Sequence, residues 1–204
     1  MILSDREIRV ALEDALIVID PQPERSLWTS TAVDLTLDSG ILRWREKHET
    51  TSPTGQDLIV CPAQPAFNVQ EMMKDPAFAI TESLDPHGYV LQPGKFILGY
   101  TREKIKLPHR SRVAGRVEGK SSLARIGVGV HVTAPTIHAG FGFKLEEAEH
   151  PGTPIQLEIF NLGPMPVKLE TGMPICQLIL EEVRERPEKG YRGKFQAQQV
   201  FDKP

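Results

Sequence analysis

The chain has 204 residues, with 24 lysines and arginines against 27 aspartates and glutamates, a net charge of -3 and a pI near 6.1. This length suits one domain, or one domain with an arm, and is enough to bury a core. The slight acidity gives no general attraction to nucleic acid or to an anionic membrane, and no apolar run approaches the roughly 20 residues that span a bilayer. We therefore expect neither as a partner.

The first segment is expected to be helical. Ser4-Asp5-Arg6-Glu7 is a capping box, with Ser4 as N-cap and Glu7 at the N3 position, and the helix should end between residues 14 and 17. The N-terminus lacks the basic region and the apolar stretch of a signal peptide. Two cysteines, Cys61 and Cys176, lie far apart, which predicts reduced thiols in a cytoplasmic protein and no zinc site built on cysteine pairs.

Beyond the first helix, short apolar or alternating segments are separated by turn residues, and the 17 prolines and 16 glycines are spread along the chain. Many short strands with frequent turns predict an all-β sandwich or barrel. Clear strand candidates cover residues 32–37, 96–100, 128–132, 155–160 and 175–180. A short helix is expected at residues 69–74, and a helical turn at residues 121–125.

The C-terminal segment differs in character from the rest. Residues 184–203 carry many charges, two glycines and only isolated aromatic residues, so they have little to pack into a core. We predict a barrel domain over residues 1–183 and an arm over residues 184–204, which orders on a ligand or on a neighbouring subunit. The alternative is a disordered tail.

Residues 115–122 read G-R-V-E-G-K-S-S and nearly match a P-loop. A P-loop needs four residues between its glycines, whereas Gly115 and Gly119 are separated by three, and no long helix pattern follows. Lys120 and the serine hydroxyls still suit anionic oxygens, and one helical turn would place Ser121 and Arg125 on the same side. The segment is either such an anion-binding turn or an ordinary polar turn.

Glu158 lies within the apolar strand candidate I-Q-L-E-I-F-N at residues 155–161. Strict alternation places Gln156, Glu158 and Phe160 on one face of this strand and its other apolar residues on the opposite face. A carboxylate that faces a pocket could shuttle protons. The alternative is a carboxylate on the wet face of a half-exposed strand.

Several segments together resemble one known family. They are L-Q-P-G-K-F-I-L-G-Y (91–100), L-P (107–108), G-R-V-E-G-K-S-S-L-A-R-I-G-V-G-V-H-V-T-A (115–134), T-A-V-D-L-T-L (31–37), L-E-I-F-N (157–161), L-E-T-G-M-P-I-C-Q-L (169–178) and K-F-Q-A-Q-Q (194–199). These segments occur in family order and cover most of the chain. The chain resembles the dCTP deaminases, which belong to the dUTPase-like trimers.

The resemblance implies a mainly β fold, a distorted dUTPase-like β-barrel of jelly-roll type with a short N-terminal helix and few other helices. It also implies a homotrimer with sites between subunits, and hydrolysis of dCTP to dUTP and ammonia without zinc. The chain has no C-x-x-C, which the zinc deaminases need. Mg²⁺ would accompany the nucleotide, held mainly by the triphosphate rather than by protein ligands.

The resemblance assigns roles to individual residues. Glu158 corresponds to the catalytic carboxylate, which takes a proton from water so that hydroxide attacks C4 of cytosine, and passes protons to N3 and to the leaving ammonia. Arg125 corresponds to an arginine that positions this carboxylate and the water, and Ser121 to a serine beside the same water. The implied substrate contacts are Lys120, Ser122, His131, Val132, Ala134, His138, Phe141, Gln177, Lys194 and Gln198.

Three features depart from the family pattern. Lys120 stands where arginine is usual, which keeps the charge but loses the bidentate fork. In I-H-A-G-F (137–141), Phe141 is expected under the deoxyribose, but His138 replaces the aspartate that meets the sugar 3′-hydroxyl and, in bifunctional members, activates water. An insertion at residues 144–154 is either a surface hairpin or a segment that reshapes the site.

The first hypothesis is thus a deaminase that releases dUTP. The first alternative is a bifunctional enzyme that continues to dUMP and pyrophosphate, which His138 weakens. The second alternative is a nucleotide-sensing family member with little catalysis. The joint presence of Glu158, Arg125 and Ser121 argues against it. The resemblance leaves open whether dTTP inhibits.

Overall fold

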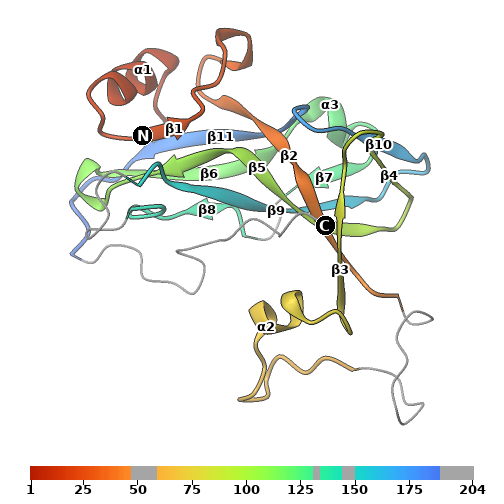
Figure 1. Cartoon of the computed structure of the whole chain (residues 1–204). Coiled ribbons are helices and arrows are strands. Elements are labelled where there is room, and N and C mark those ends of the chain that lie inside the picture. Colours follow the sequence, from red (N-terminus) through yellow and green to blue (C-terminus); the bar gives the residue numbers. More distant parts are fainter. Residues whose placement is uncertain (47–58, 131–133, 144–149, 189–204) are drawn as a thin grey trace.

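The computed structural model describes residues 1–46, 59–130, 134–143 and 150–188. Figure 1 shows a mainly β molecule with few short helices. The elements in chain order are α1 (Asp5–Glu13), β1 (Val18–Asp20), η1 (Arg25–Leu27), β2 (Val33–Trp44), α2 (Val69–Lys74), β3 (Ala79–Ser83), β4 (Tyr89–Leu91), β5 (Phe96–Lys106), η3 (His109–Ser111), β6 (Val113–Gly119), α3 (Ser121–Ala124), β7 (Val128–Val130), β8 (Thr136–Ile137), β9 (Thr153–Asn161), β10 (Val167–Leu169) and β11 (Pro174–Glu182).

Nine strands in the described ranges form one curled antiparallel sheet. Its main path runs β7-β9-β5-β2-β11-β6-β8, while β1 pairs with β5 and β3 pairs with β2. A separate ribbon joins β4 to β10. The turn α3 connects β6, near one end of this path, to β7 at the other end, and β6 and β7 are in contact. The predicted mainly β fold with a curled, barrel-like sheet is confirmed.

The core lies inside the curl of the sheet and is built by alternation along the strands. In β9, Leu157 and Ile159 are fully buried, and in β2 the same is true of Leu35 and Leu37. Inward side chains of β11 such as Leu178 complete this layer. The outward positions of these strands are therefore available to build a site.

The N-terminal helix forms as its capping box predicts. Glu7 Oε2 accepts the Ser4 backbone N–H at 2.7 Å, and Ser4 Oγ accepts the Glu7 N–H at 3.4 Å. The helix ends at Glu13, and its Ile8 is fully buried. The predicted helix at residues 69–74 is also present as α2, which Figure 1 shows projecting from the barrel together with part of β3.

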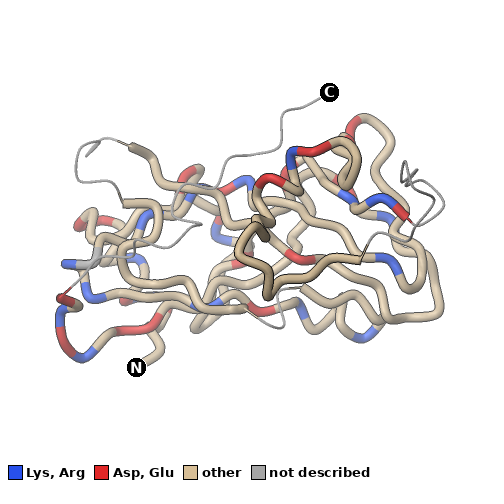
Figure 2. The backbone as a smooth tube through the Cα atoms, turned by 90° about the horizontal axis from the view of Figure 1, so that it is seen from below, with Lys and Arg blue, Asp and Glu red and all other residues tan. Residues whose placement is uncertain are grey.

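Charged residues are mixed over the chain. Figure 2 shows Lys and Arg interspersed with Asp and Glu along the backbone. Among the described residues, no helix is long and apolar enough to cross a membrane. Local clusters of charge, rather than one face of a single sign, are therefore where anion binding should be sought.

A close backbone approach joins the end of α3 to the loop that follows β9. A Cβ on Gly127, whose φ is 90°, would lie 2.2 Å from the Gly163 nitrogen, and a Cβ on Gly163 would lie 2.1 Å from the Ile126 carbonyl oxygen. The Leu162 N–H donates to the Gly127 carbonyl at 2.8 Å, and the side chain of buried Asn161 accepts the Gly163 N–H at 2.9 Å. These contacts hold the α3 turn against the end of β9.

Gly163→Ala should lower the free energy of unfolding by about 1–3 kcal/mol, because the new Cβ overlaps a backbone oxygen and forces the two segments apart. Gly119→Ala is the matched control, since its Cβ would lie 3.7 Å from its nearest neighbour, the Val130 nitrogen. Urea unfolding followed by circular dichroism measures both variants. Equal stabilities would contradict the close approach.

Candidate active site

The α3 turn presents a cluster of polar side chains at the end of β6. Lys120 is the N-cap of this turn, and the Arg125 N–H donates to the Ser121 carbonyl at 3.2 Å, so the predicted helical turn is confirmed. Ser121, Ser122 and Arg125 are exposed, whereas Leu123 of the same turn packs against the core. The turn is thus anchored by its apolar side and presents its hydroxyls and guanidinium outward.

Lys120 does not stand alone at this turn. Its ammonium forms an ion pair with the Asp34 carboxylate on β2, and the other oxygen of Asp34 accepts the Gln177 side-chain amide of β11 at 3.0 Å. Antiparallel pairing places Gln177 opposite Asp34 on one side and opposite Glu118 on the other. Asp34 is only 8% exposed, so this pair is partly shielded from water.

Cys176 lies beside this cluster and is fully buried. Burial, reinforced by the negative charges of Glu103 and Asp34, raises the pKa of the Cys176 thiol well above its usual range. The thiol therefore stays protonated and is not a nucleophile. Cys61, the other cysteine, is exposed and also free.

Glu158 lies on the outward face of β9, as the alternation predicted. It is half-buried and pairs across the sheet with Leu98 of β5, while Gln156 on the same face donates its amide to the Tyr100 hydroxyl at 2.9 Å. Burial raises the pKa of Tyr100 to about 12, so this phenol is neutral at physiological pH. The neighbours of Glu158 on the sheet are thus apolar Leu98 across the strands and the uncharged Gln156–Tyr100 pair beside it.

The strand β7 connects the two parts of the site. It directly follows the α3 turn, and its Val130 pairs with Ile159, the residue after Glu158. The approach of Gly127 to Gly163 holds the same junction from the other side. The turn that carries Ser121 and Arg125 therefore leads into the strand paired with the one that carries the candidate carboxylate.

The segment predicted to meet the sugar, residues 138–141, has one end at the surface and the other in the core. His138 is exposed, whereas Phe141 is only 4% exposed and belongs to the main core cluster. The Phe141 N–H donates to the His138 carbonyl at 3.0 Å, and the Phe141 carbonyl accepts the Leu107 N–H at 2.9 Å. The ring expected under the deoxyribose thus packs inside this chain. Ala134, the predicted base contact, is exposed.

Several predicted substrate contacts lie outside the described residues. They are His131, Val132, Lys194 and Gln198, and most of the insertion at residues 144–154 lies there too. The predicted division into a barrel of residues 1–183 and an arm likewise stays a prediction.

Asp34 is not among the site residues predicted from the sequence, although its segment T-A-V-D-L-T-L carries part of the family resemblance. The available signal was an acidic residue among the apolar residues of a strand, in a segment shared with the family. The structure gives Asp34 two partners, Lys120 and Gln177, both of which are predicted substrate contacts. Asp34, which joins these two residues, is therefore the member of the site that the sequence pattern did not reveal.

Comparison with known proteins places the chain in a protein family. A family model described as dCTP deaminase-like matches residues 2–183. The chain belongs to this family. It is 35% identical to a protein of Persephonella marina named "dCTP deaminase, dUMP-forming", over 97% of this chain and 93% of that protein.

Some relatives of this chain are named dCTP deaminase without the qualifier dUMP-forming. It is 32% identical to a "dCTP deaminase" of Rhodospirillum rubrum, over 94% of this chain and 87% of that protein. The crystal structure of 2′-deoxycytidine 5′-triphosphate deaminase from Agrobacterium tumefaciens shares its fold, with a TM-score of 0.60 at 20% identity. That match covers 88% of this chain but only 47% of the other.

Asp34→Asn should lower the free energy of unfolding by about 1–3 kcal/mol, because it leaves the partly buried Lys120 ammonium without its counter-charge. Glu71→Gln is the matched control, since Glu71 pairs with Lys74 at 3.6 Å with both side chains about 70% exposed, and such pairs contribute less than about 1 kcal/mol. Urea unfolding at neutral pH compares the two. An Asp34→Asn variant as stable as the control would show that the ion pair contributes nothing to folding.

Proposed function

We propose that this chain deaminates dCTP at C4 of cytosine and then hydrolyses the resulting dUTP to dUMP and pyrophosphate. The observation that carries this proposal is the 35% identity, over nearly the whole chain, to a relative named as a dUMP-forming dCTP deaminase. The sequence alone favoured dUTP as the final product. The relatives favour its alternative, because most of those with the strongest similarity are named dUMP-forming.

In the proposed deamination, Glu158 acts as a proton shuttle. It takes a proton from water, hydroxide attacks C4, and the carboxyl group delivers protons to N3 and to the departing ammonia. Its half-buried position on the outward face of β9, opposite Leu98, supports this role because the carboxyl group is accessible from one side only. Arg125 and Ser121 position the water and the carboxylate. No zinc is needed, since the carboxylate itself activates water.

The proposed triphosphate contacts centre on the α3 turn. Ser122 is exposed there, and Lys120 supplies a cation that Asp34 orients. Gln177 keeps Asp34 in place. His131, Val132 and Ala134 would bind the base, while Lys194 and Gln198 would close over the phosphates from the C-terminal arm.

The donor groups near this turn fit Mg²⁺ arriving with the nucleotide. Among the described residues, no three His, Cys, Asp or Glu side chains gather in a way that could hold a metal ion. The Asp34 carboxylate and the Gln177 amide nevertheless provide oxygen atoms of the kind that Mg²⁺ prefers, directly or through water. When bound, the ion would neutralise phosphate charge, with most of its ligands from the triphosphate and from water.

The site is proposed to be completed by neighbouring subunits of a homotrimer. Ser121, Ser122 and Arg125 lie exposed on one chain, and Phe141 packs into the core rather than offering an open surface to the sugar. A partner subunit would therefore cover the exposed turn and enclose the nucleotide. His138, exposed at the same segment, is the proposed contact of the sugar 3′-hydroxyl.

Glu158→Gln should lower kcat for ammonia release by about 10²–10⁴-fold while dCTP binding persists, because glutamine keeps the shape of the side chain but cannot carry the proton. Glu182→Gln is the matched control, as Glu182 lies on β11, separated from β9 by β5 and β2, in an exposed pair with Arg112. Ammonia release and equilibrium binding measure the two effects. Retained turnover in Glu158→Gln would exclude the shuttle.

The second step is tested at His138. The unsubstituted chain should convert dCTP to dUMP. His138→Ala should accumulate dUTP, because alanine cannot take a proton from water as the imidazole can. His138→Asp should restore dUMP. Anion-exchange chromatography of the products decides between the outcomes. Accumulation of dUTP alone by the unsubstituted chain would contradict the second step and leave the deamination standing.

A further inference from the structure

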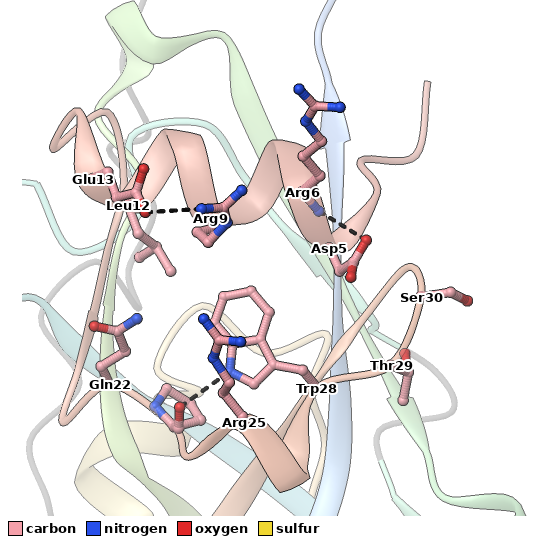
Figure 3. A pocket seen from close by; sticks show the side chains of 11 residues that line it. Asp5, Arg6, Arg9, Leu12, Glu13, Gln22, Arg25, Trp28, Thr29 and Ser30 are labelled. Atoms are coloured by element: carbon pink, nitrogen blue, oxygen red, sulfur yellow. Dashed lines mark hydrogen bonds and ion pairs between the residues drawn. The ribbon is translucent and has the colours of Figure 1, made fainter.

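A second cleft, apart from the site described above, opens between α1 and the loop that leads into β2. It encloses about 1000 Å³, and Figure 3 shows the indole of Trp28 between the helix and the loop. The lining includes Arg9 and Leu12 of α1, and Gln22 and Arg25 of the loop. None of the candidate active-site residues contributes to it.

The indole of Trp28 is held firmly at the base of this cleft. Its Nε1–H donates to the Pro23 carbonyl at 3.1 Å, and its ring packs against the main core cluster. Its backbone forms a bridge with Val33 at the start of β2. The ring is therefore pre-oriented, with its polar edge already satisfied, so a planar ligand could stack on it at little cost in side-chain entropy.

Positive charge gathers around the ring in a chain that is acidic overall. Three arginines, Arg6, Arg9 and Arg25, line the cleft against two carboxylates, Asp5 and Glu13. Glu13 pairs with Arg9 at 3.5 Å, but both side chains are more than half exposed, so the pair is weak and a stronger anion can displace it.

Arg25 provides the second cation beside the ring. Within the described part of the chain it forms no ion pair. In Figure 3, Arg9 extends from the helix above the Trp28 ring, Arg25 rises from the loop below and overlaps the ring in this view, and Gln22 lies to the left. Two guanidinium groups that line the same cleft as an indole suit a ligand that is planar at one end and multiply anionic at the other.

We propose that this cleft, named here the Trp28 cleft, is a second ligand site that binds a nucleoside phosphate. The base stacks on the indole, and the phosphates lie on Arg9 and Arg25, whose forked guanidinium groups match phosphate oxygens. The Gln22 amide is available to the edge of the base or to the sugar. The volume lies within the usual range of small-molecule sites. The proposal does not depend on the chemistry at Glu158.

The test uses Trp28 as its own reporter. The chain has two tryptophans, so Trp44→Phe leaves Trp28 as the single fluorophore. Titration with ATP should quench its emission in a saturable way, since the base stacks on the ring. Adding Arg9→Gln and Arg25→Gln should weaken the affinity at least tenfold, and inorganic tripolyphosphate should compete with ATP.

Arg184→Gln is the matched control, because Arg184 is an exposed arginine outside the cleft, and it should leave ATP affinity unchanged. A quench that does not saturate, or that survives the double arginine variant, would overturn the proposal. So would a double variant that changes only the sedimentation of the chain, which would indicate a subunit interface. If Trp44→Phe does not fold, calorimetric titration of the unsubstituted chain and of the double variant gives the same decision.

Discussion

The candidate active site depends on the pairing of β7 with β9. This pairing is short, with Val128–Val130 opposite Ile159–Asn161, and it is tightened where Gly127 and Gly163 approach without intervening side chains. The α3 turn lies just before β7, so its position follows from this pairing and from the packing of its own Leu123. A site assembled from a turn and a strand gains its precision from such backbone contacts, because exposed side chains alone would leave the turn free to move.

The local parts of this arrangement are readable from the sequence, whereas the long-range contacts are not. Alternation predicts the outward face of Glu158, and the spacing of Ser121 and Arg125 predicts one helical turn, because both patterns depend only on neighbouring residues. Asp34, in contrast, meets Lys120 and Gln177 at separations of 86 and 143 residues, and the registers of β2 with β11 and of β11 with β6 bring these residues together. Phe141 packs inward because backbone hydrogen bonds of its turn join it to Leu107, which no pattern encodes.

The ion pair of Lys120 with Asp34 lowers the net positive charge at the start of the α3 turn. An ammonium group that is partly neutralised attracts a triphosphate less strongly than a free one, and it lacks the bidentate geometry of arginine. The carboxylate, however, holds the ammonium in one place and adds oxygen atoms to the proposed phosphate site. The turn is thereby suited to a nucleotide that carries its own divalent cation, since that cation restores the positive charge that Asp34 removes.

The strand β2 links this phosphate region to the Trp28 cleft. Trp28 bridges to Val33, and the next residue, Asp34, is the partner of Lys120, so the two regions share the first residues of a single strand. Thr29 reinforces the junction, because its hydroxyl accepts the Ala32 N–H at 3.0 Å. These hydrogen bonds and the backbone bridge hold residues 28–32 against the start of β2. The segment that carries the Trp28 indole therefore continues directly into the strand that carries the carboxylate partner of Lys120.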